Sequence, residues 1–102
     1  MKLFISQPTR DKTDEQIKEE RNKAIVDAVK KTKALELIDF DVIDRFFEGS
    51  PAKATPLWCL GKNIKLLRRA DIVYFCKDWE KSNGCIIEHE CAVRYGKKCI
   101  YA

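Results

Sequence analysis

The chain has no long hydrophobic run and contains little glycine, proline or histidine. Among its 102 residues are four glycines, three prolines and a single histidine. No apolar segment approaches the roughly 20 residues that a membrane-spanning helix needs, so we expect no membrane partner. The N-terminal segment MKLFISQPTR is too short and too quickly polar for a signal peptide. We therefore expect a cytoplasmic protein.

The five cysteines lack the spacing of a disulfide framework or a zinc site. Their number is odd and no two form a CxxC pair, which favours reduced thiols in the core. Cys85, His89 and Cys91 are close in sequence, but on a helix only residues 85 and 89 share a face. Structural zinc needs four convergent ligands. We predict neither a metal site nor another cofactor, and packing as the main role of Cys85.

The net charge of +4 is mild, and acidic residues are spread through the chain. No basic stripe carries the interleaved aromatic side chains on which nucleic-acid bases stack, so we expect no nucleic-acid partner. The composition, 45% hydrophobic and 35% charged, is typical of a globular protein. At this length we predict a single domain over residues 1–102.

Strand-like and helix-like segments alternate along the chain. The predicted helices cover residues 13–33, 55–69 and 84–95, and the predicted strand cores are Leu3–Ser6, Leu37–Val42, Ile72–Cys76 and Cys99–Tyr101. Thr13 and Gln16 fit a capping box, and Thr55 precedes a proline at the first helical position. Such alternation implies right-handed crossovers. We predict a three-layer α/β/α domain with a four-stranded parallel sheet in the order 2-1-3-4.

The apolar spacing predicts an inner face for each helix. In the helix at 13–33 this face consists of Ile17, Ala24, Ile25 and Ala28. In the helix at 55–69 it consists of Leu57, Leu60, Gly61, Ile64 and Leu67. In the helix at 84–95 it consists of Gly84, Ile87, Glu88, Cys91, Ala92 and Tyr95. Four further apolar residues, Trp58, Leu66, Ile86 and Val93, fall off these faces. Clustered exposed apolar residues indicate a contact surface. We therefore predict a symmetric homo-oligomer, packed through the third helix.

Glu88 is the most informative residue, because it places a carboxylate on a predicted buried face. An ionised carboxylate there costs several kcal/mol unless it is paired or faces a cavity. Ligands of open parallel sheets bind outside the carboxyl ends of the strands, where the loops at 7–10, 44–47 and 77–84 should meet. Glu88 lies one turn inside the helix that begins there, which suits an ionised nucleophile. The alternative is a structural carboxylate paired with Arg10 or Arg45.

The chain also resembles a known family. Gly84, Glu88 and Ala92, spaced by four after a strand that ends in an acidic loop, resemble the nucleoside 2-deoxyribosyltransferase superfamily. Three segments look more particularly like a small branch of it found in phages and bacteria: KLFISQPTRDKTDEQIKEER, IDFDVIDRFFEGSPAKATPLWCLGKNIKLLRRADIVYF and WEKSNGCIIEHECAVRYGKKCIY. The branch usually has glycine at the position of Asp11. The resemblance covers nearly the whole chain and implies a flavodoxin- or Rossmann-like fold.

The resemblance also implies roles for single residues. Glu88 matches the glutamate that attacks the anomeric carbon of a nucleoside and forms a covalent glycosyl–enzyme intermediate. Gln7 matches a first-loop position that contacts sugar or base. A retaining reaction also needs a proton donor for the leaving base, for which we favour Asp78. Further candidates for substrate binding are Arg10, which could hold a phosphate, Trp79 and Phe46, which could stack on a base, and Asp44, Asn83 and Gly84.

Each of these residues also has a purely structural interpretation. In that interpretation Asp78 is a solvated acid of a loop, Gln7 caps backbone groups at the end of a strand, and Trp79 covers the core. The sequence therefore leaves two functions open. The first is N-glycosidic bond chemistry on nucleosides or nucleotides, by transfer or hydrolysis. The second is non-catalytic binding or sequestration of a nucleotide-derived small molecule.

Overall fold

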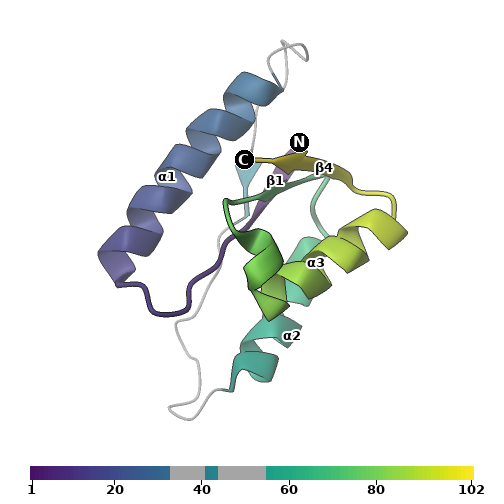
Figure 1. Ribbon diagram of the computed structural model, residues 1–102. Coiled ribbons are helices and arrows are strands. Elements are labelled where there is room, and N and C mark those ends of the chain that lie inside the picture. Colours follow the sequence, from purple (N-terminus) through teal and green to yellow (C-terminus); the bar gives the residue numbers. More distant parts are fainter. Residues whose placement is uncertain (33–40, 44–54) are drawn as a thin grey trace.

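The computed structural model describes residues 1–32, 41–43 and 55–102 of the chain (Figure 1). Its elements, in chain order, are β1 (Lys2–Ser6), α1 (Asp14–Lys31), β2 (Asp41–Val42), α2 (Pro56–Leu67), β3 (Ile72–Phe75), the 3-10 turn η1 (Trp79–Lys81), α3 (Asn83–Arg94) and β4 (Lys98–Tyr101). The predicted strand Leu37–Val42 is described only at its end, and residues 37–40 lie outside the described part of the chain.

The four strands form one parallel sheet in the order β2-β1-β3-β4, as predicted. β1 is central and pairs with β2 through Lys2 and Asp41, and with β3 from Leu3–Ile72 to Ser6–Phe75. β4 extends the sheet beside β3, in register from Ile72–Lys98 to Phe75–Tyr101. Strand order therefore reverses at β1 and β3, and the carboxyl ends of these two strands form the switch point of the sheet.

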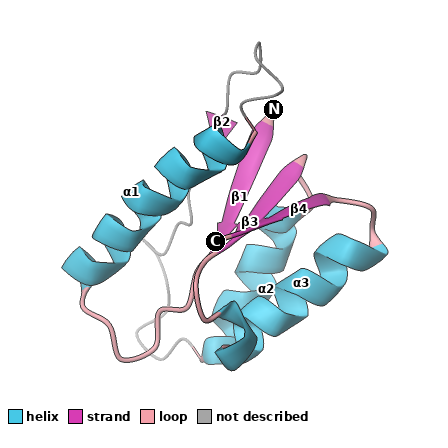
Figure 2. Cartoon of the chain, turned by 45° about the horizontal axis from the view of Figure 1, so that its top comes forward, coloured by secondary structure: helices cyan, strands magenta, loops and turns pink. Residues whose placement is uncertain are grey.

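Helices cover both faces of the sheet (Figures 1 and 2). On the α1 face, buried side chains of the strands pack on Ala24 and Ala28, with Ile25 partly buried against them. On the opposite face, Phe4, Val73 and Phe75 pack against Leu67 of α2 and Ala92 of α3. Successive residues of β1 alternate between these two cores, as the strand period requires. The three-layer α/β/α prediction is confirmed.

The helix ends follow local sequence signals. Thr13 and Gln16 form the predicted capping box at α1, and the Thr55 hydroxyl accepts from Trp58 N ahead of Pro56 at α2. α3 ends with Lys97 N donating to Ala92 O and Gly96 N to Val93 O, the two bonds of a Schellman motif. Gly96 there has φ +71°, a conformation that favours glycine.

The predicted inner face of α2 is wrong in part. Leu57 is 75% exposed and Gly61 is exposed, whereas Asn63 and Leu67 are buried. Leu66, expected off the inner face, packs partly against the core. The physical reason is that α2 carries apolar residues on most of its circumference, so its sequence does not determine which side faces the sheet.

The face of α3 is also rotated from the prediction, by about one residue. Cys85, Glu88 and Ala92 are buried, while Ile87 is exposed and Tyr95 is 80% exposed. Of the two small buried side chains, Ala92 packs in the core beside Phe4, Val73 and Phe75, and Cys85 is 1% exposed. Cys85 thus has the packing role expected of it.

All five cysteines are free thiols, of which Cys76 and Cys85 are buried and the other three are partly buried; their reduced state stays a prediction. Among the described residues, no helix is both long and apolar enough to span a membrane.

Candidate functional site at the carboxyl end of the central strand

Glu88 is buried at the carboxyl end of β1, on the α2–α3 face of the sheet. Its side chain is 1% exposed, and its Oε1 accepts a hydrogen bond of 3.3 Å from the Ser6 hydroxyl. Ser6 is the last residue of β1 and is itself fully buried. The prediction that Glu88 lies on the inner face of its helix is confirmed. Two polar groups 82 residues apart in sequence thus meet at the switch point of the sheet.

Arg10, one of the two predicted structural partners of Glu88, does not reach it. The Arg10 side chain is 95% exposed, and its Nε lies 4.0 Å from Asp11 Oδ2. An exposed pair of this kind stabilises little. Arg45, the second predicted partner, lies outside the described residues, as do the substrate-binding candidates Asp44 and Phe46.

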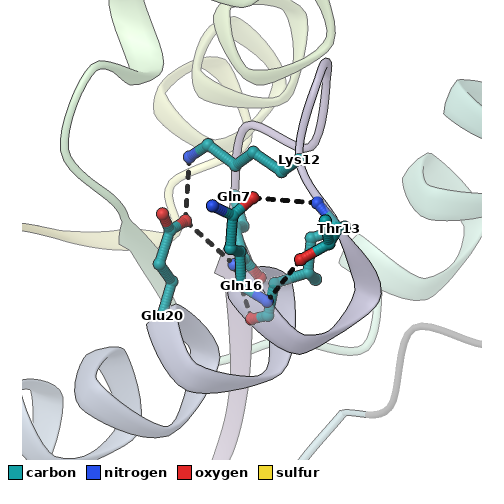
Figure 3. Close-up of polar contacts among 6 residues, drawn as sticks. Gln7, Lys12, Thr13, Gln16 and Glu20 are labelled. Carbon is teal, nitrogen blue, oxygen red and sulfur yellow. Dashed lines mark hydrogen bonds and ion pairs between the residues drawn. The ribbon is translucent and has the colours of Figure 1, made fainter.

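Gln7, the residue after Ser6, is buried on the opposite face of the sheet (Figure 3). Its Nε2 donates to Ile17 O at 2.8 Å and to Glu20 Oε2 at 3.4 Å, both on α1. Lys12 Nζ lies 2.8 Å from the same Glu20 oxygen. The hydrogen bond from Lys12, supported by Gln7, holds the pKa of Glu20 below its ordinary value against the opposing effect of burial. Gln7 therefore anchors α1 to the end of β1, while Ser6 faces Glu88.

A second polar cluster lies further along α1. The Tyr74 hydroxyl donates to Asp27 Oδ2, and Lys31 Nζ lies 3.2 Å from the same oxygen. The hydrogen bond from Tyr74 lowers the pKa of Asp27, and burial, followed by this bond, raises the pKa of Tyr74. A hollow of about 370 Å³ opens beside these groups, lined among others by Glu20, Ala24, Asp27, Tyr74, Cys76 and Asp78.

Asp78, the predicted proton donor, lines this hollow on the α1 side of the sheet. Its side chain is 55% exposed and lies 3.7 Å from Lys81 Nζ. Its backbone has φ +66°, so it occupies the left-handed region at the start of the η1 turn. The structure thus places Asp78 in an exposed loop, and its catalytic role stays a prediction.

Trp79 packs against the α2–α3 core, which supports its interpretation as a lid. One face of its ring is taken by His89, with ring centroids 4.3 Å apart, and its centroid lies 5.3 Å from that of Phe75. His89 Nε2 in turn lies 2.7 Å from the Tyr101 hydroxyl. A base stacking on Trp79 would have to use what remains of the ring surface, so this role also stays a prediction.

Asn83 is exposed in the first turn of α3, and Gly84 is half-buried. A Cβ added at Gly84 would meet Leu60 Cδ1 at 4.0 Å, which is ordinary contact, so among the described residues no close approach explains the glycine. Within the described residues, no group of three or more His, Cys, Asp or Glu side chains could hold a metal ion.

Three buried polar side chains are not marked by the sequence, those of Ser6, Thr32 and Asn63. Ser6 reads as the polar end of an apolar strand, yet it is the hydrogen-bond donor to Glu88. Asn63 is 7% exposed on α2, at a position that the apolar spacing did not mark. The alternation of β1 could have placed Ser6 on the face of Phe4, but no local signal marks the phase of α2 at Asn63.

Comparisons with protein-family models, with curated proteins and with solved structures found no match for this chain. The fold is therefore established by the coordinates themselves, and the nature of the site is argued from its geometry.

Proposed function

We propose that this protein acts on the N-glycosidic bond of nucleosides or nucleotides, by transfer or hydrolysis, with Glu88 as the nucleophile. The observation that carries the proposal is a carboxylate 1% exposed at the carboxyl end of the central parallel strand, hydrogen-bonded to the Ser6 hydroxyl. This is the place where open α/β sheets bind their ligands. The resemblance of the chain to nucleoside 2-deoxyribosyltransferases supports the same chemistry.

The energetics of Glu88 favour a functional role. Burying a carboxylate opposes folding by several kcal/mol unless hydrogen bonds and charges compensate it, and an apolar residue at this helix position would avoid the cost. Strongly desolvated ionisable groups concentrate at functional sites. Burial also implies that a substrate gains access to Glu88 only when the side chains above it move apart.

In the proposed reaction, a Glu88 carboxylate oxygen forms a bond to the anomeric carbon of the sugar. The bond from that carbon to the base nitrogen breaks, and its electron pair stays on the base, which takes a proton from an acid that we assign to Asp78. A second base or a water molecule then displaces the sugar from Glu88 and gives its proton to the carboxylate of Asp78, which restores both side chains. Attack by a base gives transfer, and attack by water gives hydrolysis.

A trapping experiment tests this proposal. Nucleosides with fluorine at C2′ in the arabino configuration form slowly hydrolysed glycosyl esters, because fluorine destabilises the cationic transition state. We expect the intact mass of the protein to increase by one fluorosugar residue, with the modification mapped to the peptide that contains Glu88. Glu88→Ala should show no increase, and Glu90→Ala, an exposed acid of the same helix, is the matched control. An adduct on another residue, or none across purine and pyrimidine probes, would contradict the assignment.

Non-catalytic binding of a nucleotide-derived molecule is the second candidate, and one observation favours it. The predicted proton donor Asp78 is exposed and lies beside Lys81. The hollow that it lines is on the α1 side of the sheet. A binder would bury Glu88 against a ligand without releasing base. Calorimetric titration with nucleoside monophosphates, combined with chromatography for free base, distinguishes the two: heat of binding without base release identifies the binder.

We also propose that the protein forms a symmetric homo-oligomer through α3. Ile86, Ile87 and Val93 are 42%, 43% and 55% exposed, so α3 carries an exposed apolar surface away from the face that buries Glu88. Light scattering at micromolar concentration should give at least twice the chain mass of 11.9 kDa. Val93→Glu should reduce the mass to that of one chain, and a single-chain mass for the unaltered protein at rising concentration would contradict the assembly.

A further inference from the structure

Ser6 is fixed by strand pairing at the carboxyl end of the central strand. It ends the central strand β1, pairs with Phe75 of β3, and its carbonyl accepts from Cys76 N at 3.0 Å. The side chain is fully buried, and it points to the α2–α3 face while Gln7 points to the α1 face. A hydroxyl on such a scaffold has little freedom to choose another partner.

We propose that Ser6 is the positioning residue of the site: its hydroxyl holds Oε1 of Glu88 and thereby sets the direction of the carboxylate. The inference rests on the proposed function for its catalytic consequence, but the contact itself does not depend on it. A hydroxyl has a single proton, and donating it to the carboxylate stabilises the ionised form, which is the form that a nucleophile requires. Ser6 touches Glu88 and acts on a substrate only through it.

Ser6 reaches Glu88, whereas Arg10 does not. Arg10 points into solvent beside Asp11 and takes no part in the site. The sheet thus supplies the donor from the strand that precedes Glu88 by 82 residues.

A double-mutant cycle tests the contact without any need for activity. Urea unfolding is measured for the unaltered protein, Ser6→Ala, Glu88→Leu and the double variant. We expect Ser6→Ala to lower the urea midpoint of the unaltered protein, because it removes a hydrogen bond to a buried carboxylate. In the Glu88→Leu background the same change should leave the midpoint unchanged or raise it, because the hydroxyl has then lost its acceptor. An equal decrease in both backgrounds overturns the proposal.

Thr32→Val is the matched control. The Thr32 hydroxyl is also buried, but it donates to Ala28 O at 2.7 Å within the end of α1. Its removal should lower the midpoint by the same amount whether Glu88 or leucine is present at position 88. Coupling of Thr32 to position 88 as large as that of Ser6 would show a general effect of buried hydroxyls and would also overturn the assignment.

Turnover of a panel of 2′-deoxynucleosides and their 5′-monophosphates gives the second readout. With Ser6→Ala we expect kcat to fall about 10- to 100-fold while KM stays within about 2-fold, since a hydrogen bond to a charged group orients the nucleophile but does not bind substrate. Ser6→Cys, a weaker donor of similar size, should recover part of kcat. A rise in KM with kcat unchanged overturns the positioning role. Coupling in the cycle without any base release by the unaltered protein contradicts the proposed function and leaves the positioning of Glu88 standing.

Discussion

Ser6 and Gln7 are neighbours in sequence, but they belong to two different electrostatic environments. On the α2–α3 face, Ser6 donates to Glu88, which is almost completely buried. On the α1 face, Gln7 donates to Glu20, a partly exposed carboxylate that also has Lys12 at 2.8 Å. The two carboxylates carry the same charge and lie near the same end of the same strand.

The difference between the two carboxylates indicates a functional role for Glu88 and a structural role for Glu20. Glu20 lies near water and beside an ammonium group, so its ionised form is stable without further structure. Such an ion pair fixes the loop that carries Lys12 and needs no ligand. Glu88 is almost completely buried, so desolvation opposes its charge, and one of its contacts is the Ser6 hydroxyl. Three predictions test this difference between Glu88 and Glu20 and between the two faces of the sheet.

The largest effect is expected from replacing each carboxylate by its amide. Glu88→Gln should lower base release by at least about 10³-fold, because an amide oxygen cannot form the glycosyl ester. Glu20→Gln should change turnover by less than about 3-fold and lower stability only modestly, since a partly exposed pair contributes about 1 kcal/mol or less. Chromatographic assay of free base and urea unfolding measure the two effects. Equal losses of turnover in both variants would remove the distinction between the faces.

An intermediate effect concerns the acid stability of the α1 face. The folded pKa of Asp27 is below its ordinary value of 3.8, so Asp27 stabilises the fold above that pH, and this contribution is lost as the pH falls through the folded value. Tyr74→Phe removes the hydrogen bond that is the main cause. We expect a loss of about 1 kcal/mol at pH 7 that diminishes at lower pH, where Asp27 is protonated in both proteins.

Urea unfolding from pH 7 down to about pH 3 measures this dependence. Tyr95→Phe is the control, because Tyr95 is 80% exposed, and its stability curve should overlay that of the unaltered protein. A Tyr74→Phe cost that stays constant with pH would show that the hydroxyl stabilises the fold independently of Asp27.

The smallest effect is expected in the loop that brings Lys12 to Glu20. Asp11 has φ +61°, a left-handed conformation that costs an ordinary residue free energy and that glycine adopts readily. Asp11→Gly should raise stability by up to about 0.5 kcal/mol, because the strain relieved slightly exceeds the added entropy of the unfolded chain. Gly96→Ala, at φ +71°, should lower it by about 1 kcal/mol. Thermal unfolding measures both, and a decrease for Asp11→Gly would show that the aspartate side chain itself holds the loop.

Much of the fold could be predicted because its signals are local or periodic. The strand cores of β1, β3 and β4 are short apolar runs, and the caps at Thr13 and Thr55 act within one helical turn. Because crossover connections are right-handed, few strand orders are possible for these elements. The predicted order is the one observed.

The site could be predicted only in part. Glu88 was identified because a charge interrupts an apolar face, and that signal survives even though the face itself is rotated. Gln7 and Asp78 were assigned to the same pocket because both follow strands, yet their described contacts are on the α1 side. A residue that follows a strand is predicted to lie at the carboxyl end of the sheet, but this position does not predict on which face of the sheet its side chain lies.

The sequence alone predicts the approximate positions of the three helices and of β1, β3 and β4, the parallel order of the sheet and the burial of one carboxylate. These follow from interactions within a few residues and from the period of apolar side chains. Only the tertiary structure decided which sides of α2 and α3 face the sheet, and that Ser6 meets Glu88 and Tyr74 meets Asp27, partners 82 and 47 residues apart. The physical reason is that such pairs form only when whole helices and strands pack against each other. Their contacts therefore depend on residues that are far apart in sequence, and no short sequence pattern predicts them.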